Sequence, residues 1–231
     1  SFEIEKGEFA VIVGSSGAGK TTVFNLLTDV YVPTEGTITL ENQNIVGKKT
    51  YQITQGGISR TFQNIRLFKD ISVIDNVKIA MNFQMKYSVL SGIFRTPGYR
   101  REEQQIDQRA HELLQVFHLD EKAEDLAKNL PYGQQRKLEI ARALATNPKI
   151  LLLDEPAAGM NPTETKELME TIRLIRDRFE IAILLIEHDM NFVMGICERI
   201  YVLDYGKVIA EGNAEEIRNN PRVITAYLGG E

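Results

Sequence analysis

One short glycine-rich segment constrains the fold of this chain more than any other feature. Residues 14–22 read Gly-Ser-Ser-Gly-Ala-Gly-Lys-Thr-Thr, which matches the pattern G-x-x-x-x-G-K-[ST]. The apolar run Phe9–Val13 before it predicts a buried strand, and Thr21–Leu27 after it predicts the start of a helix. A strand that turns through glycines into a helix N-terminus presents unpaired N–H groups to an anion. The segment therefore predicts a nucleoside triphosphate site; the alternative is a glycine-rich turn that binds nothing.

The residue types of this segment have separate roles in holding phosphate. Glycine permits backbone angles that a side chain would forbid, so consecutive N–H groups can turn inward around a phosphate. The ammonium group of Lys20 is expected on the β- and γ-phosphates, and the hydroxyl of Thr21 can ligate Mg²⁺. The predicted nucleotide-binding residues are Gly14, Ser15, Ser16, Gly17, Ala18, Gly19, Lys20, Thr21 and Thr22.

Two acidic residues follow a second apolar run. Ile150–Leu153 is continuously apolar, as expected of a parallel strand covered on both faces, and Asp154 and Glu155 come directly after it. Open α/β sheets bind ligands at the carboxyl ends of their strands. Adjacent residues of a strand point to opposite faces, so neighbouring acids can take different roles. We expect Asp154 to hold Mg²⁺ through water and Glu155 to orient or deprotonate an attacking water.

Two further polar residues stand at predicted strand ends. The apolar run Ile181–Ile186 is followed by Glu187 and His188, and a histidine at this place can donate to a γ-phosphate or hold the water. The short alternating segment Ile58–Phe62 ends at Gln63, whose neutral amide can contact Mg²⁺ or water. Each residue alone would also suit a structural role, but together with the phosphate loop the functional interpretation is favoured.

The middle of the chain changes from strand patterns to helical spacing. Ser72 and Asp75 resemble a capping box, and further helices are predicted at Glu102–Phe117 and Tyr132–Ala145. Strands alternate with helices on both sides of this stretch. The pattern predicts an α/β nucleotide-binding core that is interrupted by an all-helical insert near residues 72–147.

The first residues look like the middle of a domain. Phe2 and Ile4 alternate with glutamates and predict a strand, so we expect residues to precede Ser1 in the natural protein. The remaining predicted elements are a strand at Thr37–Leu40, a helix from Asn161 to Ile175, a hairpin of Arg199–Leu203 and Lys207–Ala210, and a helix at Asn213–Asn220.

Composition limits the class of function. The 27 Lys and Arg residues against 32 Asp and Glu give a net charge of −5, so no basic field argues for a nucleic-acid partner. The single cysteine, Cys197, excludes an intrachain disulfide and lies in an apolar stretch that suits a core position. The longest purely apolar run, Ile181–Ile186, is much shorter than a helix that spans a bilayer.

A further segment makes the pattern specific, because residues 130–136 read Leu-Pro-Tyr-Gly-Gln-Gln-Arg. With it, the chain resembles the ATP-binding-cassette (ABC) ATPases, whose motifs it carries in the family's order over nearly its whole length. The matching motifs are the Walker A segment Gly14–Thr21, the Q-loop residue Gln63, the signature residues Leu130, Pro131, Tyr132, Gly133 and Gln134, the Walker B segment Leu151–Glu155 and the switch histidine His188.

Finer features resemble the ATPases of branched-chain amino-acid importers. These features are the stretches Arg60–Phe68, Tyr132–Arg136 and Ala157–Pro162, the long basic insert around Tyr87–Arg101 and the tail Ala226–Gly230. A basic loop is usually only solvated, and contact with lipid headgroups or a membrane partner is the second interpretation. The transported cargo rests on analogy alone.

The resemblance implies an α/β fold, the P-loop NTPase fold of ABC type. It implies a single ABC ATPase domain over residues 1–231, with a nucleotide-binding core at 1–71 and 148–231, a helical subdomain at 72–147 and a partly missing N-terminal antiparallel β subdomain. The implied cofactors are ATP and Mg²⁺. The implied catalytic residues are Glu155, His188 and Gln63, and the implied metal site consists of Thr21, Gln63 and Asp154.

The resemblance also implies partners. A second ATPase subunit, identical or homologous, is expected head to tail, so that the signature of one completes the site over the Walker A segment of the other. Two transmembrane permease subunits are expected and, through them, an extracytoplasmic amino-acid-binding protein, but no nucleic acid. The chain itself is expected at the cytoplasmic face of the cell membrane, as a peripheral protein. The alternatives are the same motor for urea, short amides or an exported lipid, a soluble ABC ATPase of DNA repair or translation, and a P-loop kinase.

The chain departs from the family pattern at three places. Pro131 stands where serine is usual, which removes a hydroxyl and an N–H and forfeits roughly 1.5–3 kcal/mol of hydrogen bonding to phosphate. Gly133 keeps its N–H, so we expect weaker binding across the dimer and not a loss of function. Asn161 falls near the place of the D-loop aspartate, and the aromatic residue that stacks on adenine would precede Ser1.

Overall fold

The computed structural model describes residues 1–82 and 96–228, without the side chains of residues 191, 227 and 228. The chain separates into two compact units, Ser1–Gln63 with Pro148–Glu231 and Asn64–Asn147. Most of the basic insert around Tyr87–Arg101, and Gly229 and Gly230 of the tail, lie outside the described residues.

A six-stranded sheet forms the centre of the first unit, in the order β4-β5-β6-β1-β7-β8. Its strands are β1 (Phe9–Gly14), β4 (Ile58–Arg60), β5 (Ile150–Asp154), β6 (Ala182–Ile186), β7 (Arg199–Asp204) and β8 (Lys207–Gly212). Neighbouring strands pair in parallel except β7 and β8, which form an antiparallel hairpin. The predicted hairpin and the predicted buried strands are therefore confirmed.

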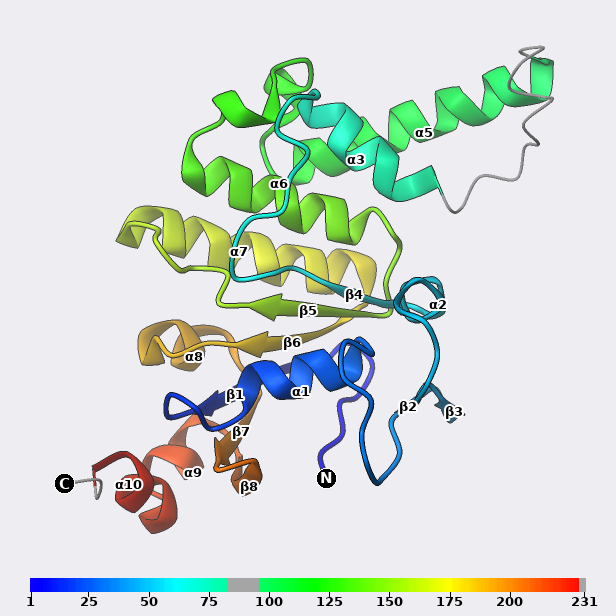
Figure 1. The fold of residues 1–231 in the computed structure, drawn as a ribbon. Helices are drawn as coiled ribbons and strands as arrows, with labels where there is room; N and C mark the ends of the chain where they lie inside the picture. The colour runs from blue at the N-terminus through cyan, green and yellow to red at the C-terminus, as the bar shows by residue number, and fades with distance from the viewer. Residues whose placement is uncertain (83–95, 229–231) are drawn as a thin grey trace. The chain divides into compact units, whose positions relative to one another are not determined.

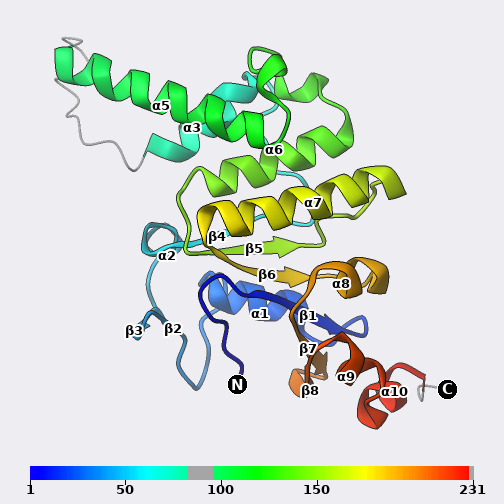
Figure 2. The ribbon, with the colours of Figure 1, turned by 180° about the vertical axis from the view of Figure 1, so that it is seen from behind.

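Helices cover both faces of this sheet (Figures 1 and 2). Helix α1 (Lys20–Leu27) lies on one face, and α7 (Pro162–Phe179) and α8 (Met190–Ile196) lie on the other. Every residue of β6 is buried, as are the last four residues of β5. Cover on both faces explains why these strands are continuously apolar in sequence. Because the strands are parallel, the carboxyl ends of β1, β5 and β6 meet at one edge of the sheet.

Side-chain caps set the starts of two helices of the first unit. Glu164 N donates to Asn161 Oδ1 at 3.0 Å and Asn161 N donates to Glu164 Oε2 at 3.0 Å, which is a capping box at the start of α7. Asn213 and Glu216 form the same arrangement at the start of α9. The predicted starts of both helices are confirmed. The remaining elements of the unit are α2 (Thr50–Gly56), α9 (Ala214–Arg218), α10 (Pro221–Leu228) and a two-stranded sheet of β2 (Thr39–Leu40) and β3 (Gln43–Asn44).

The strand predicted at residues 2–5 is wrong, because these residues have no strand structure. Phe2 and Ile4 instead pack against the hydrophobic core, and the ring of Phe2 lies 5.2 Å from that of Tyr201. The Tyr201 hydroxyl donates to the carbonyl oxygen of Glu3 at 2.6 Å. The alternating pattern therefore reflects side chains anchored in the core without a backbone ladder.

The second unit is helical. It contains α3 (Val73–Met81), α5 (Pro97–Val116) and α6 (Tyr132–Leu144), and α3 packs against both of the others. The predicted cap of α3 is confirmed, since Asp75 N donates to Ser72 Oγ at 3.1 Å. Helix α5 begins before the predicted Glu102, because Thr96 accepts from Tyr99 N and Pro97 suits the first helical position.

Residues 64–71, which the sequence assigned to the nucleotide-binding core, belong to the helical unit. Glu139 Oε1 accepts from the backbone N–H of Arg66 at 3.1 Å. The buried side chain of Asn76 accepts from Phe68 N at 2.9 Å and donates to Phe68 O at 3.0 Å. These bonds fix the segment to α6 and α3, so the boundary falls directly after Gln63 and not at residue 72.

Candidate nucleotide-binding site

The glycine-rich segment forms a tight turn between β1 and α1. A Cβ atom at Gly14 would lie 2.3 Å from the carbonyl oxygen of Leu203, so no other residue fits there without a backbone shift. Gly19 has φ 103° and stands directly before α1, in a conformation that favours glycine. Lys20 Nζ donates to the carbonyl oxygens of Gly14 and Ser15, both at 2.9 Å. The ammonium group is therefore held on the inner side of the loop.

The turn of the hairpin β7–β8 contacts this loop, a contact that the sequence did not predict. Gly206 N donates to the carbonyl oxygen of Ala18 at 2.8 Å. Ala18 is buried, whereas Ser15, Ser16 and Thr21 are exposed. The loop is thus fixed at its back, while Ser15, Ser16 and Thr21 remain accessible to a ligand.

The three predicted catalytic residues lie together at the end of β5 and β6. Gln63 Nε2 donates to Glu155 Oε2 at 2.9 Å, and His188 Nδ1 lies 3.8 Å from Glu155 Oε1. Glu155 has φ 46°, a left-handed conformation that is uncommon for a residue with a side chain. Its backbone N–H donates to Ile186 O at 3.0 Å, which fixes it to β6. Strained backbone of this kind clusters at functional sites.

Asp154 is paired with an arginine that sequence reasoning did not single out. Arg60 Nη2 lies 2.7 Å from Asp154 Oδ2, and both side chains are 5% exposed. Arg60 Nη1 also donates to Asn25 Oδ1 at 2.7 Å. The guanidinium carbon lies 5.3 Å from the ring centroid of Phe24 and 5.0 Å from that of Phe62. In the sequence, Arg60 is only an arginine on a short predicted strand, and nothing in the pattern indicates that it pairs with Asp154, 94 positions away.

The predicted metal ligands fit Mg²⁺ by their chemistry. Thr21, Gln63 and Asp154 supply hydroxyl, amide and carboxylate oxygens, which are the ligands that this hard cation takes. Asp154 Oδ2 is engaged by Arg60, so Asp154 would act through its other oxygen or through water. Gln63 directs its amide nitrogen at Glu155, so its oxygen would have to turn toward a cation.

The signature residues lie in the second unit, around the start of α6. Pro131 occupies the N-cap position and makes no side-chain cap, and its carbonyl oxygen accepts from Gln135 N at 2.9 Å. Leu130 and Gly133 are buried, while Tyr132 is 46% exposed. Gln134 accepts from Lys122 Nζ at 2.8 Å.

A buried ion pair stabilises this helix start and was also missed from the sequence. Arg136 Nη1 lies 2.8 Å from Glu139 Oε2, with side chains 0% and 2% exposed. Arg136 Nη2 also lies 3.4 Å from the Tyr132 hydroxyl. Because Glu139 also holds the backbone of Arg66, the signature helix is connected to the segment that follows Gln63.

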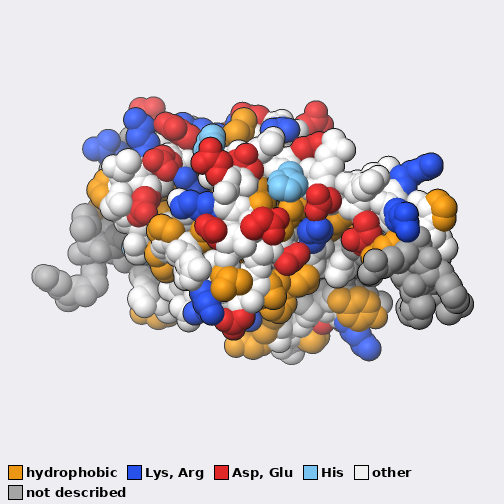
Figure 3. Space-filling view, turned by 90° about the horizontal axis from the view of Figure 1, so that it is seen from above, with side chains coloured by type: hydrophobic (Ala, Val, Ile, Leu, Met, Phe, Trp, Pro, Cys, Tyr) orange, Lys and Arg blue, Asp and Glu red, His pale blue; other side chains and the backbone are white. Residues whose placement is uncertain are grey.

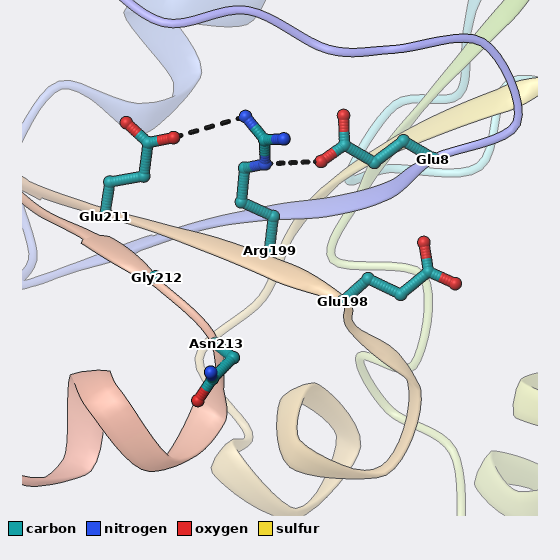
Figure 4. Close-up of a pocket in the computed structure, with 6 residues that line it drawn as sticks. All are labelled: Glu8, Glu198, Arg199, Glu211, Gly212 and Asn213. Carbon is teal, nitrogen blue, oxygen red and sulfur yellow. Dashed lines mark hydrogen bonds and ion pairs between the residues drawn. The ribbon is translucent and has the colours of Figure 1, made fainter.

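A hollow of about 460 Å³ lies elsewhere in the first unit and contains none of the predicted site residues. Figure 4 shows Arg199 between two of its acidic lining residues, with Nε 2.6 Å from Glu8 Oε1 and Nη1 3.2 Å from Glu211 Oε1. Its guanidinium is already paired, so this hollow is a poor phosphate site. Among the described residues drawn in Figure 3, acidic and basic side chains are interspersed.

Together, β1, its glycine turn and α1, with acids at the end of β5 in the same sheet, define a P-loop nucleotide-binding domain. The chain belongs to the ABC transporter family, whose model matches residues 1–158. A second model, described as branched-chain amino acid ATP-binding cassette transporter, matches residues 207–231. The chain is therefore an ABC ATPase that binds and hydrolyses ATP in transport.

Curated relatives align over nearly the whole chain. The high-affinity branched-chain amino acid transport ATP-binding protein LivG of Salmonella typhimurium is 51% identical over 99% of this chain and 90% of its own length. The protein BraF of Pseudomonas aeruginosa, with the same description, is 45% identical over the same shares.

Solved structures of the family have the same fold. An ATP-binding cassette of an ABC transporter in its ADP conformation has a TM-score of 0.82 and 30% identity, over 99% of this chain and 90% of that chain. A dimeric ATP-binding cassette in a post-hydrolysis state, bound to ADP and Pi, has a TM-score of 0.76 and 27% identity, over 92% of this chain and 88% of that chain. Among the described residues, no helix is long and apolar enough to cross a membrane.

The Arg60–Asp154 pair yields a stability prediction. Arg60→Ala would leave a buried, unpaired carboxylate, and breaking such a pair costs about 3–5 kcal/mol. We expect urea unfolding to show a loss of that size. Arg218→Ala, at an exposed position of α9, is the matched control and should change stability by less than about 0.5 kcal/mol. An unfolding midpoint of Arg60→Ala equal to that of the wild type would contradict the interpretation.

Proposed function

We propose that this chain is the ATP-hydrolysing subunit of a membrane importer for branched-chain or related amino acids. The observation that carries the chemistry is the convergence of Gln63 and His188 on Glu155, at the sheet edge where β1 enters the phosphate loop. The cargo is supported by the 51% identity to LivG.

Within the site, the loop residues 14–22 hold the nucleotide phosphates, with Lys20 as the cation on the β- and γ-phosphates. Thr21, Gln63 and Asp154 would hold Mg²⁺, which when bound would neutralise charge on the phosphate oxygens. Glu155 orients or deprotonates the attacking water, because of the two acids that follow β5 it is the one not paired with Arg60. His188 faces the γ-phosphate or the water.

Gln63 is the sensor of the site. Its amide nitrogen is bonded to Glu155, and its backbone continues into the segment that Glu139 holds. Turning its oxygen toward Mg²⁺ would break the bond to Glu155 and free that carboxylate for water. Gln63 would thus be shared between the cation and Glu155.

The active assembly is a head-to-tail dimer with a second ATPase subunit, identical or homologous. The signature residues 130–134 of one subunit complete the phosphate site of the other, using the N-terminus of α6 as an anion site. Pro131 lacks an N–H and a hydroxyl, so this contact depends on the N–H of Gly133. The similar cassette solved as a dimer with ADP and Pi supports this arrangement.

Transport requires membrane partners. Two permease subunits carry the cargo, and an extracytoplasmic amino-acid-binding protein delivers it to them, while the ATPases stand at the cytoplasmic face. The cassette is then one ABC ATPase domain, in which the helical subdomain carries the signature and the sheet unit carries the phosphate loop.

Glu155→Gln tests the assignment of the base. The substitution keeps the hydrogen-bonding shape but removes the proton acceptor, so kcat for ATP hydrolysis should fall about 10²–10⁴-fold. ATP binding should persist, and ATP should trap a dimer that light scattering detects. Glu170→Gln, the same change at an exposed position of α7 outside the site, is the comparison variant and should retain turnover. Unchanged turnover of Glu155→Gln would remove Glu155 from the mechanism.

The cargo and partners are tested by purifying the tagged protein from detergent-solubilised membranes and identifying its companions by mass spectrometry. Permease chains and a second ATPase are expected, and leucine, isoleucine and valine should stimulate hydrolysis when the complex and its binding protein are reconstituted in vesicles. Nucleic-acid or ribosomal companions without membrane chains would overturn the importer assignment.

A further inference from the structure

A buried carboxylate lies directly behind the switch histidine. Glu187 directly follows the apolar strand β6, and its side chain is 2% exposed. Its Oε2 accepts from the backbone N–H of His188 at 2.9 Å and of Asp189 at 3.3 Å. These two bonds fix the carboxylate with respect to the backbone that carries the histidine.

Two carboxylates lie close to the same nitrogen, Nδ1, of the His188 ring. Its Nδ1 lies 3.6 Å from Glu187 Oε2 and 3.8 Å from Glu155 Oε1. Glu155 is the more exposed of the two acids and also accepts from Gln63. Glu187 is held by two backbone hydrogen bonds and is almost inaccessible to solvent. A carboxylate in that setting determines which imidazole nitrogen keeps the proton.

We propose that Glu187 is a positioning residue for His188, holding the imidazole with its proton on Nδ1 so that the unprotonated Nε2 accepts a hydrogen bond from the attacking water. The inference rests on the proposed function for the role of His188. It explains why an acid with no predicted chemistry stands buried at this sheet edge. It also leaves Glu155 free for water and Gln63, because the histidine has a second acceptor.

The surroundings of Glu187 support an unusual carboxylate. Burial raises its pKa, and hydrogen bonds from the backbone of His188 and Asp189 oppose that rise. Its Oε1 is buried without a hydrogen bond of ordinary geometry among the described residues, although the backbone N–H of Ala157 faces the carboxylate. The nearby Cys197 thiol has a raised pKa, chiefly through burial and then through the charges of Glu187 and Glu198.

Histidine NMR tests the proposal on the intact chain, which has three histidines. Protein labelled with ¹⁵N-histidine is observed at alkaline pH, on the plateau where the ring ¹⁵N shifts no longer change with pH, and His188→Gln identifies the His188 signals. The wild type should show His188 with its proton on Nδ1. In Glu187→Gln, whose amide oxygen can still accept from both backbone N–H groups, the negative charge 3.6 Å from Nδ1 is removed, and the tautomer ratio should move toward Nε2–H by about tenfold.

The remaining histidines and a neighbouring acid give the controls. The signals of His111 and His118, both in the second unit, should be the same in every variant and report intact folding. Asp189→Asn removes a nearby charge without removing the carboxylate that faces Nδ1, and it should leave the His188 tautomer unchanged. A wild-type His188 protonated on Nε2 would overturn the proposal, and this result needs no variant. An identical tautomer ratio in Glu187→Gln would overturn it as well.

Turnover separates this proposal from the proposed function. Glu187→Gln should lower kcat about 10–100-fold, as loss of a supporting carboxylate does, with the KM for ATP nearly unchanged. If the wild type hydrolyses no ATP in its complex, the proposed function fails while the tautomer result stands. If hydrolysis is normal and Glu187→Gln alters neither kcat nor tautomer, the positioning role alone fails.

Discussion

The parallel register of three buried strands is the constraint on which the site depends. β1 pairs with β6, and β6 pairs with β5. The carboxyl ends of these three adjacent strands therefore carry Gly14, Glu155 and His188. A slip of one residue would turn the apolar side chains out of the core, so the packing that stabilises the sheet also fixes the polar residues at its edge. Stability and site geometry thus have the same origin.

The acidic residues at this edge differ in their burial and in their hydrogen-bond partners. Asp154 is held by Arg60, with both side chains nearly inaccessible, whereas Glu155 is met by the neutral amide of Gln63. Glu187 is buried and bonded to backbone N–H groups. In the second unit, the Arg136–Glu139 pair has the same character and fixes the segment after Gln63 to the signature helix.

Local patterns in the sequence predicted the parts of the fold that local physics decides. The glycine turn, the apolar strands β5 and β6 and the capped start of α7 each follow from residues close together in the chain. The strand predicted at residues 2–5 was wrong because alternation cannot reveal whether a backbone partner exists. Arg60 was missed because its partner Asp154 is 94 positions away, and Glu187 because a lone acid after an apolar run has no distinctive pattern.

Hydrogen exchange with and without Mg-ATP tests most directly the claim that residues 14–22 hold the nucleotide phosphates. On the wild-type protein, saturating Mg-ATP should slow exchange of the backbone amides from Gly17 to Thr22, because their N–H groups then donate to phosphate oxygens. Lys20→Ala should show no such slowing at the same concentration. Wild-type protein that binds Mg-ATP while these amides exchange as fast as before would contradict the account.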